Sequence, residues 1–154
     1  MTDKDLPEFK NPPDQRLFEI LTSNKYVAIL GLTPDQNAAS HRVARFLKRH
    51  GFQIYPVNPR YPTVLGEPSR PYLRNITGPV DIVEVFRRPE HLTGIVPDAL
   101  QVGAKIVWLQ LGTVNPGFAR EAQDAGLEVV MNKCMKKEFE RLVLKRNLGR
   151  RHAP

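Results

Sequence analysis

The chain has 154 residues, of which 41% are hydrophobic and 25% are charged, and its formal net charge is +7. This length is typical of one compact domain, and no stretch approaches the ~18 apolar residues of a membrane span. Cys134 is the only cysteine and the four histidines are scattered, which excludes an intramolecular disulfide and argues against a structural zinc site. Residues 1–5 lack the basic and apolar regions of a secretion signal, so we expect a cytoplasmic protein.

The first third of the chain predicts two helices with one strand between them. Residues 1–12 are polar and contain prolines, so we expect a flexible lead. Pro13 suits the first position of a short helix, and an apolar strand follows at Tyr26–Leu30. Apolar residues then recur at helical spacing between Ser40, a natural N-cap, and Gly51, a natural C-terminal stop.

The remainder of the chain continues this alternation. Short runs rich in β-branched residues predict strands over residues 52–57, 80–86, 105–111 and 127–131. The proline-rich stretch between the first two of these permits at most a short helix. Helical patterns separate the later strands, and the pattern over 92–100 contains Gly94 and Pro97, which predicts a kink or two short pieces.

Strands that alternate with helices indicate a parallel sheet covered by helices on both faces. We therefore predict the α/β class: a single Rossmann-like doubly wound domain over residues 13–144, with a five-stranded parallel sheet flanked by helices and a basic tail over 145–154. Ligands of such sheets bind outside the carboxyl ends of the strands at a switch point, which we place between the first strand and the fourth. The residues expected there are Gly31 to Ser40, Asn58 to Tyr61, Phe86 to Arg88 and Gln110 to Gly112.

The first strand ends in a turn that does not match the dinucleotide fingerprint G-x-G-x-x-G, since the glycine after Gly31 is Gly51. The longer loop from Gly31 to Ser40 can wrap a phosphate with backbone N–H groups and with the hydroxyls of Thr33 and Ser40. Ser40 can equally be only the N-cap of the next helix, and the two roles are compatible.

The end of the second strand is basic. No aspartate or glutamate occurs from Gln36 through Gly66, so the carboxylate that holds a free ribose hydroxyl in NAD-binding proteins is missing. Arg60 suits a phosphorylated ribose instead, because charge-assisted hydrogen bonds are roughly twice as strong as neutral ones. Tyr61 is placed to stack on a base or to shield the loop, and Arg42 lies one turn from the phosphate loop.

Two further strand ends complete the expected edge. Phe86, Arg87 and Arg88 follow the third strand, and Gln110 and Gly112 end the fourth. We expect one of the two arginines to pair with a neighbouring acid, so that at most one contacts a ligand. The acids available for this pairing are Glu84 and Glu90.

The positive charge is concentrated near the C-terminus, where residues 133–154 carry eight basic side chains against two acidic ones. Such a segment usually forms a solvated face and less often a surface for nucleic acid or another polyanion. Arg45 and Arg49 are likewise expected on a solvated helix face.

Seven segments, in their order and spacing, resemble the small CoA-binding domain proteins, which are similar to the CoA-binding domain of the succinyl-CoA synthetase alpha subunit. The resemblance runs over roughly residues 13 to 143. Its segments are Val27–Thr33, Ser40 with Val43 and Phe46–Leu47, Val57–Tyr61, Leu65–Glu67, Val80–Val83 with Val85–Arg88, Gly103–Lys105 with Trp108–Gly112, and Asn132–Cys134.

The resemblance implies binding of coenzyme A or an acyl-CoA through the first turn, the Asn58-Pro59-Arg60 segment and the turn after the third strand. The family's first loop commonly carries a basic residue before the serine, whereas residues 35–39 here include none, which weakens the anion contact expected from that loop. The candidate cofactor-binding residues, from the pattern and the resemblance together, are Gly31, Leu32, Thr33, Ser40, Arg42, Asn58, Pro59, Arg60, Tyr61, Phe86, Arg87, Arg88, Gln110 and Gly112.

We expect a binding module for CoA without evident catalytic machinery, because the common nucleophile, zinc and P-loop motifs are absent from the sequence. An NADP-binding oxidoreductase or redox-sensing domain is the first alternative, since Arg60 would fit that phosphorylated ribose nearly as well. Polyanion or nucleic-acid binding through the basic C-terminus is the second. The leading hypothesis expects neither a nucleic-acid partner nor a membrane, and it leaves a homodimer or larger assembly open.

Overall fold

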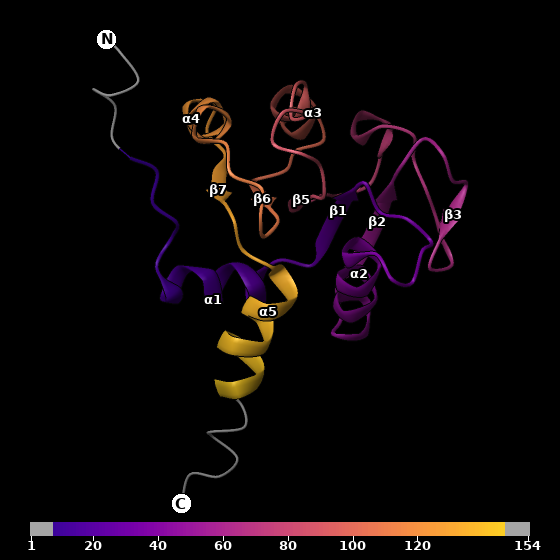
Figure 1. Ribbon diagram of the computed structural model, residues 1–154, viewed down its shortest axis with the longest axis horizontal. Coiled ribbons are helices and arrows are strands. Elements are labelled where there is room, and N and C mark those ends of the chain that lie inside the picture. The colour runs from indigo at the N-terminus through magenta and orange to yellow at the C-terminus, as the bar shows by residue number, and fades with distance from the viewer. Residues whose placement is uncertain (1–7, 147–154) are drawn as a thin grey trace, which may run out of the picture.

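Five parallel strands form the central sheet of the computed structural model, which describes residues 8–146 (Figure 1). Their order is β2-β1-β5-β6-β7, and their bounds are β1 Tyr26–Leu30, β2 Gln53–Val57, β5 Ile82–Val85, β6 Ile106–Leu109 and β7 Glu128–Val130. A small antiparallel pair, β3 (Thr63–Val64) and β4 (Glu67–Pro68), lies in the segment after β2. The α/β class and the five-stranded parallel sheet predicted from the sequence are confirmed.

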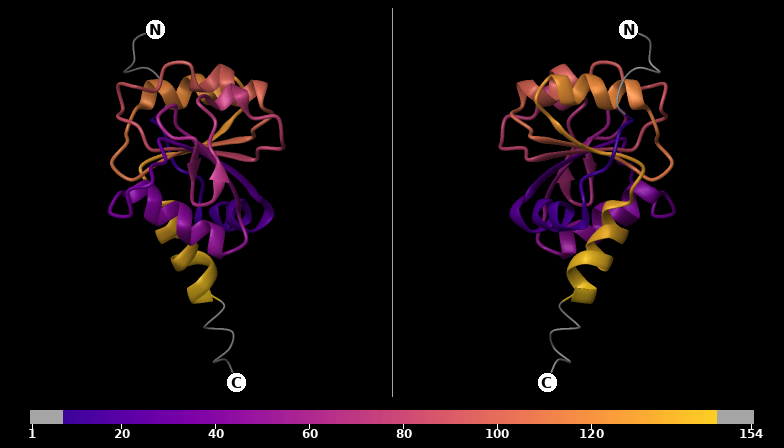
Figure 2. Two further views of the ribbon diagram at one scale, coloured as in Figure 1. Left: turned by 90° about the vertical axis from the view of Figure 1, so that its right-hand side faces the viewer. Right: turned by 90° about the vertical axis from the view of Figure 1, so that its left-hand side faces the viewer.

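Helices cover both faces of this sheet, as Figure 2 shows from two sides. One layer consists of α1 (Asp14–Ser23), α2 (Ala39–Arg49) and α5 (Met135–Phe139), which continues as a π-helical turn over Glu140–Leu144. The other layer consists of α3 (Ile95–Gln101), α4 (Pro116–Asp124) and a short 3-10 turn at Leu73–Asn75. None of the helices described in residues 8–146 is long and apolar enough to cross a membrane.

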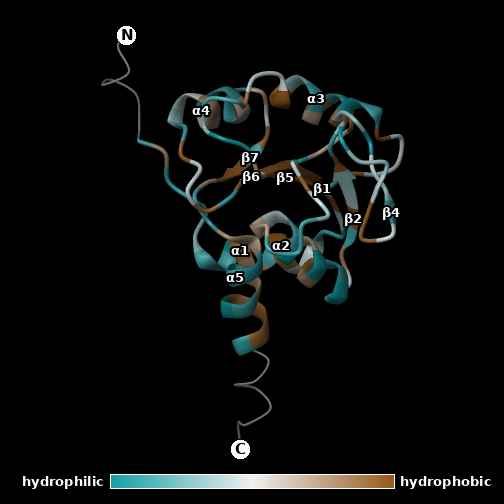
Figure 3. Ribbon diagram, turned by 45° about the vertical axis from the view of Figure 1, so that its right-hand side comes forward, coloured by the Kyte–Doolittle hydropathy of each residue, from teal (hydrophilic) through white to brown (hydrophobic). Residues whose placement is uncertain are grey.

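The strands are apolar on both faces because each face lies beneath a layer of helices. In β1, Val27 and Ile29 pack with the layer of α1, α2 and α5, whereas Ala28 and Leu30 pack with the layer of α3 and α4. The hydropathy colouring of Figure 3 accordingly shows hydrophobic brown along β5, β6 and β7 in the middle of the fold. The core therefore consists of two apolar layers separated by the sheet.

The strand order corrects one expectation about the switch point. β1 lies between β2 and β5, so its neighbours are the second and the third predicted strands and not the fourth. α2, which follows β1, and α3, which follows β5, cover opposite faces of the sheet. The chain therefore diverges to the two faces where β1 and β5 end, and this is the switch point. A local pattern cannot reveal it, because strand pairing joins distant residues.

Three helix starts also differ from the sequence prediction. The N-cap of α2 is Ala38, not Ser40, which lies in the first turn of the helix and is buried. Gly94 does not kink a helix. It adopts φ +85° as the N-cap of α3, and Pro97 then lies in the first turn, where a missing N–H costs little. Pro13 is the N-cap of α1 and not its first residue.

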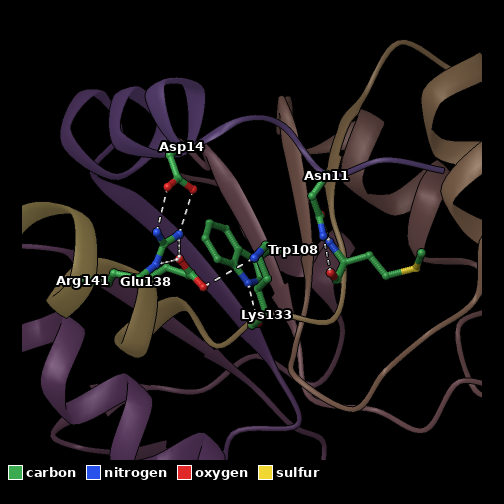
Figure 4. A network of polar contacts seen from close by, with 7 residues as sticks. Asn11, Asp14, Trp108, Lys133, Glu138 and Arg141 are labelled. Carbon is green, nitrogen blue, oxygen red and sulfur yellow. Dashed lines mark hydrogen bonds and ion pairs between the residues drawn. The ribbon is translucent and has the colours of Figure 1, made fainter.

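The N-terminal segment is fixed to the far edge of the sheet (Figure 4). The side chain of Asn11 donates to the carbonyl oxygen of Met131 at 2.9 Å and accepts from the N–H of Met131 at 2.8 Å. Phe9 packs against the core from the same segment. Thus the packed part of the chain extends N-terminal to residue 13. Residues 1–7 of the predicted lead and 147–154 of the predicted tail lie outside the described residues.

Candidate functional site

The site begins at the turn after β1, where Gly31 brings three strand ends together. Its N–H donates to the carbonyl oxygen of Val57, at the end of β2, over 2.9 Å. A Cβ at this position would lie only 2.5 Å from the carbonyl oxygen of Phe86, just after β5, and Gly31 also has φ +85°. Only glycine meets both conditions without strain, so the ends of β1, β2 and β5 are held in direct contact by this residue.

The loop that follows is braced from within. The carbonyl oxygen of Thr33 lies 2.9 Å from Nδ1 of His41, and Oγ1 of Thr33 accepts from the N–H of Asp35 at 3.3 Å. Asp35 accepts in turn from the N–H of Asn37 at 2.9 Å, and the guanidinium of Arg42 donates to the carbonyl oxygen of Asn37. Arg42, a predicted ligand contact, therefore contributes at least one N–H to holding the loop in shape.

The first turn of α2 offers backbone donors beside this loop. The first helical hydrogen bond runs from the N–H of Arg42 to the carbonyl oxygen of Ala38, so the N–H groups of Ala39, Ser40 and His41 have no partner within the helix. Ser40 and His41 are both buried. The helix dipole adds a partial positive charge at this end, and the arrangement is suited to a phosphate group.

The side chain of Leu32, the next predicted contact, has a structural role. It is fully buried in the core beneath α2, which directs its side chain away from any solvent-exposed ligand. Its carbonyl oxygen accepts from Nδ2 of Asn58 at 3.1 Å. Oδ1 of Asn58 accepts from the N–H of Arg60 at 3.0 Å, and the N–H of Asn58 donates to the carbonyl oxygen of Arg70 at 2.9 Å. Asn58 thus links the first turn to the end of β2.

Three arginines come just after the strands that end at these turns, Arg60 after β2 and Arg87 and Arg88 after β5. Arg60 and Arg88 are exposed, and Arg87 is half-buried at the end of β5. Within residues 8–146 none of the three guanidinium groups forms an ion pair with a carboxylate. The expected pairing of Arg87 or Arg88 with Glu84 or Glu90 is wrong: Glu90 forms no ion pair in residues 8–146, and the Glu84 carboxylate oxygens are buried without a hydrogen-bond partner there. The edge therefore carries three positive charges that no carboxylate of the described residues compensates.

The two aromatic residues of the predicted site pack against the hydrophobic core. Tyr61 and Phe86 are half-buried and pack against the cluster beneath α1, α2 and α5. Pro59, between Asn58 and Arg60, is exposed. These rings therefore form part of the wall of the edge, with one side on the core.

Gln110 and Gly112 lie one strand farther along, after β6. The N–H of Gly112 donates to Oδ1 of Asn132 at 2.7 Å, so this N–H is already occupied. Gln110 donates from its backbone to the carbonyl oxygen of Val85 at 3.3 Å, and its Oε1 is buried without a partner. Thr113 joins this turn to the previous one, because its hydroxyl donates to the carbonyl oxygen of Arg87 at 3.2 Å.

A cavity of about 250 Å³ opens beside the switch point, between the 3-10 turn and the start of α3. Arg87 is the one predicted site residue in its lining. Sequence reasoning missed the others, because they come from two loops that meet only in the folded chain. The lining residues are Leu30, Tyr72, Leu73, Arg74, Arg87, Thr93, Gly94, Ile95, Pro97 and Asp98.

One wall of this cavity presents an aromatic ring with a cation on it. Tyr72 is 47% exposed, and the guanidinium carbon of Arg74 lies 4.5 Å from the centre of its ring. Arg74 also approaches Asp98 across the cavity, with 3.8 Å between Nη1 and Oδ2. An exposed ring that is held in place this way can stack on a planar group.

Glu84 lies in the middle of β5, two residues before the site. Its neighbours in register are Ile29 on β1 and Trp108 on β6, and its side chain is fully buried. Burial raises the pKa of this carboxyl to about 8, because the charged form is poorly solvated in the core. Glu84 is therefore neutral at pH 7.

A parallel sheet with helices on both faces, and with a glycine turn at its switch point, defines the Rossmann-like class of domain. Comparison with known proteins gives the family. Residues 25–140 match the family described as the CoA binding domain, and the chain belongs to this family.

Several relatives support this membership. YneT of Bacillus subtilis (strain 168), an uncharacterized protein, is 36% identical over 127 residues, which cover 82% of this chain and 94% of YneT. The structure of the PH1109 protein redesigned for binding is similar, with a TM-score of 0.84 and 38% identity over 88% of this chain and 95% of that one. A hypothetical protein from Pyrococcus horikoshii OT3 has a TM-score of 0.83 and 35% identity, over 90% of this chain and 99% of that one.

Proposed function

We propose that this chain is a cytoplasmic binding module that holds coenzyme A or an acyl-CoA at the carboxyl ends of β1, β2 and β5. The observation that carries the proposal is the group of three arginines after β2 and β5, at the edge where the Gly31 turn lies, which have no carboxylate partner in residues 8–146, in a chain of the CoA-binding domain family. CoA presents a pyrophosphate and a 3′-phosphorylated ribose, so three cations in this arrangement suit its charge.

The pyrophosphate has its best position against the start of α2. The N–H groups of Ala39, Ser40 and His41 have no partner within the helix, and no side chain of residues 8–146 caps this end. Thr33 and Ser40 supply hydroxyl groups close to the same backbone. Because the loop is already fixed by Asp35 and Arg42, little ordering is required when a phosphate binds.

The ribose phosphate is proposed to bind Arg60. This side chain is exposed beyond β2, and the Asx turn of Asn58 fixes the direction of its backbone. A guanidinium recognises a phosphate with two parallel hydrogen bonds. The same contact would accept the 2′-phosphate of NADP, so the position of the phosphate on the ribose must be tested directly.

The cavity beside Leu30 is proposed to receive the adenine or the pantetheine arm. Tyr72 offers a ring for stacking, and Arg87 joins the cavity to the end of β5. We propose binding without a chemical step, since the carboxyl of Glu84 and the thiol of Cys134 are both buried.

Calorimetric titration with CoA, acetyl-CoA, dephospho-CoA, NADP and NAD tests this proposal. We expect saturable binding of CoA, and a loss of roughly tenfold or more in affinity for Arg60→Ala, because hydrogen bonds to charged groups contribute about 1.5–3 kcal/mol. Arg45→Ala is the matched control, since Arg45 is equally exposed but lies on the outer side of α2.

The ligand series identifies the partner of Arg60. Dephospho-CoA lacks the 3′-phosphate, so we expect the Arg60→Ala variant to bind CoA and dephospho-CoA equally well. Tight binding of NADP with no response to any CoA species would refute the proposal and favour the oxidoreductase alternative. Comparable affinities for CoA and acetyl-CoA would place the acyl group outside the protein contacts.

A further inference from the structure

The two helix layers of the fold carry opposite charge. α2 contains Arg42, Arg45, Lys48 and Arg49 and no acidic residue, and α5 begins with further lysines. On the other face of the sheet, the charged residues of α3 and α4 are Asp98, Arg120, Glu121 and Asp124. The excess of positive charge is therefore gathered on the layer of α1, α2 and α5.

The arginines of α2 form one row on its outer surface. Arg42, Arg45 and Arg49 are exposed and lie at i, i+3 and i+7, opposite the buried residues Val43 and Leu47. Successive members of such a row are about 5–6 Å apart. Since Arg42 is bonded to the carbonyl oxygen of Asn37, Arg45 and Arg49 are the two that face solvent alone.

α5 brings more cations to the same surface, because it packs beside this row. Phe46, the residue after Arg45, has its ring centre 5.8 Å from that of Phe139 on α5. Nζ of Lys136 lies 5.6 Å from the same Phe46 ring, and the exposed Lys137 follows it. Figures 1 and 2 show α2 and α5 on the same side of the sheet. We call Arg45, Arg49, Lys136 and Lys137 the basic face.

The cations of the basic face differ from their neighbours in having no carboxylate partner among the described residues. Lys48 is paired with Glu67 at 3.0 Å, and Arg141 with Glu138 at 2.6 Å, so these two cations are compensated. Within residues 8–146 no carboxylate forms an ion pair with any of the four residues of the basic face. A partner that binds here must therefore supply several negative charges.

In the part of the chain that the structure describes, the basic face also has no exposed apolar groups of the kind that other macromolecular partners use. The large hydrophobic residues that the structure shows as exposed are Tyr72, Leu100, Leu111 and Val114, and none belongs to α1, α2 or α5. Protein interfaces have an apolar centre, and membrane-binding helices insert apolar side chains. Nucleic-acid interfaces are instead polar and strongly positive.

We propose that the basic face binds the phosphodiester backbone of a nucleic acid. Its arginines can each grip a phosphate with a planar fork of donors, and their spacing along α2 suits a repeated charge. Lys145 and Arg146 continue the helical segment after α5, but the guanidinium of Arg146 lies over the ring of Phe18 on α1, 4.3 Å from its centre, so these two cations are not counted in the basic face. This inference goes beyond the proposed CoA site and does not depend on it, since Arg45, Arg49, Lys136 and Lys137 lie outside that site.

The test compares two double charge reversals in the full chain. Arg45→Glu with Arg49→Glu alters the basic face, whereas Lys10→Glu with Lys105→Glu changes the net charge equally at exposed positions elsewhere. Binding to a fluorescent ~20-nucleotide single strand and to the matching duplex is measured between about 50 and 200 mM salt. We expect the first variant to bind at least about tenfold more weakly and its salt slope to fall by about two, and the second to remain near the wild type.

Equal losses from the two variants would mean that binding follows net charge alone, and would overturn the assignment of this face. Absence of saturable binding by the wild type at the lowest salt would also overturn it. Anionic phosphatidylserine vesicles serve as the third probe. If the Arg45 and Arg49 reversals impaired vesicle binding alone, the partner would be a membrane and not a nucleic acid. Unchanged thermal unfolding midpoints establish that both variants fold.

Discussion

The turn after β1 and the turns after β2 and β5 use their polar groups differently. In the first turn Thr33, Asp35 and Asn37 bond to other groups of the protein, and Arg42 is drawn into the same network. Beside it, the guanidinium groups of Arg60 and Arg88 are exposed without a carboxylate partner in residues 8–146.

This difference separates stability from binding at one edge of the sheet. Groups that are bonded within the protein hold the shape, so their loss should lower the free energy of unfolding. Groups that are exposed and unpaired contribute little to that free energy, so their loss should affect a ligand alone. Glu84 extends the comparison into the core, because its carboxyl lacks a partner as the arginines do but is fully buried.

The largest effect is expected for Glu84→Gln, which should change how the free energy of unfolding depends on pH. The folded protein keeps the Glu84 proton up to a pKa of about 8, whereas the unfolded chain releases it near 4.5. The folded state therefore binds more protons in this window, and wild-type stability falls as the pH rises through it and levels off above pH 8. Glutamine cannot ionise, so this loss, on the order of 4 kcal/mol, should disappear.

Urea unfolding from pH 5 to 9 measures this difference. The advantage of the Glu84→Gln variant over the wild type should increase with pH and become constant above pH 8. Parallel pH profiles of the two proteins would show that Glu84 ionises normally in the fold. Glu90→Gln is the control, because Glu90 is exposed after the same strand.

A smaller effect is expected for Gly31→Ala. The new Cβ would lie 2.5 Å from the carbonyl oxygen of Phe86, in a residue with φ +85°. Overpacking and the left-handed backbone together should lower the free energy of unfolding by about 3 kcal/mol. Gly51→Ala is the matched control, since Gly51 has φ +94° but nothing within 4 Å of the new Cβ. If urea titration gave equal losses for both, the contact with Phe86 would be irrelevant.

Asn58→Ala should have an intermediate effect. It removes the hydrogen bond to the carbonyl oxygen of Leu32 and the one accepted from the N–H of Arg60, which together contribute about 1–2 kcal/mol. Both CoA affinity and stability should fall, because the arginine turn loses its anchor. Asn37→Ala is the control and should leave the unfolding curve almost unchanged. Asn37 forms its hydrogen bonds in the loop with its backbone N–H and C=O, and these remain in the variant.

Arg88→Ala should have the smallest effect on stability. Its side chain is exposed, and within residues 8–146 it makes no ion pair, so a change below about 0.5 kcal/mol is expected. A loss as large as that of Asn58→Ala would remove the distinction between the two kinds of turn. Thermal unfolding without ligand is sufficient to decide this.

The sequence predicts the strands well because each is a short apolar run between turn residues. Tyr26–Leu30 is reproduced without change, and the other four are shorter by one to three residues in the structure. Helix starts are less predictable, as Gly94 illustrates. A glycine and a proline within an apolar pattern suggest a kink, but here the glycine caps the helix and the proline lies in its first turn.

The candidate site is predictable where it depends on strand ends and less so where it depends on distant loops. Gly31, Asn58 and Phe86 follow strands that the pattern identifies, and the structure brings all three together. Tyr72 and Asp98 line the same cavity only because the 3-10 turn and α3 pack on the same face of the sheet. The local sequence likewise does not predict that the carboxyl of Glu84 is buried without a partner in the described residues, because the residues around it come from β1 and β6.

The pair of hydrogen bonds between Asn11 and Met131 has a consequence for how molecules of this protein associate. β7 is an outer strand of the sheet, and outer strands attract the backbone of other chains through their unpaired N–H and C=O groups. The side-chain amide of Asn11 donates to the C=O of Met131 and accepts from its N–H, so both backbone groups of this residue just past β7 are already hydrogen-bonded. A variant that begins at Pro13 would lack Asn11 and leave the N–H and C=O groups of Met131 without this partner. The edge of its sheet would then be open to pairing with a strand of a second molecule.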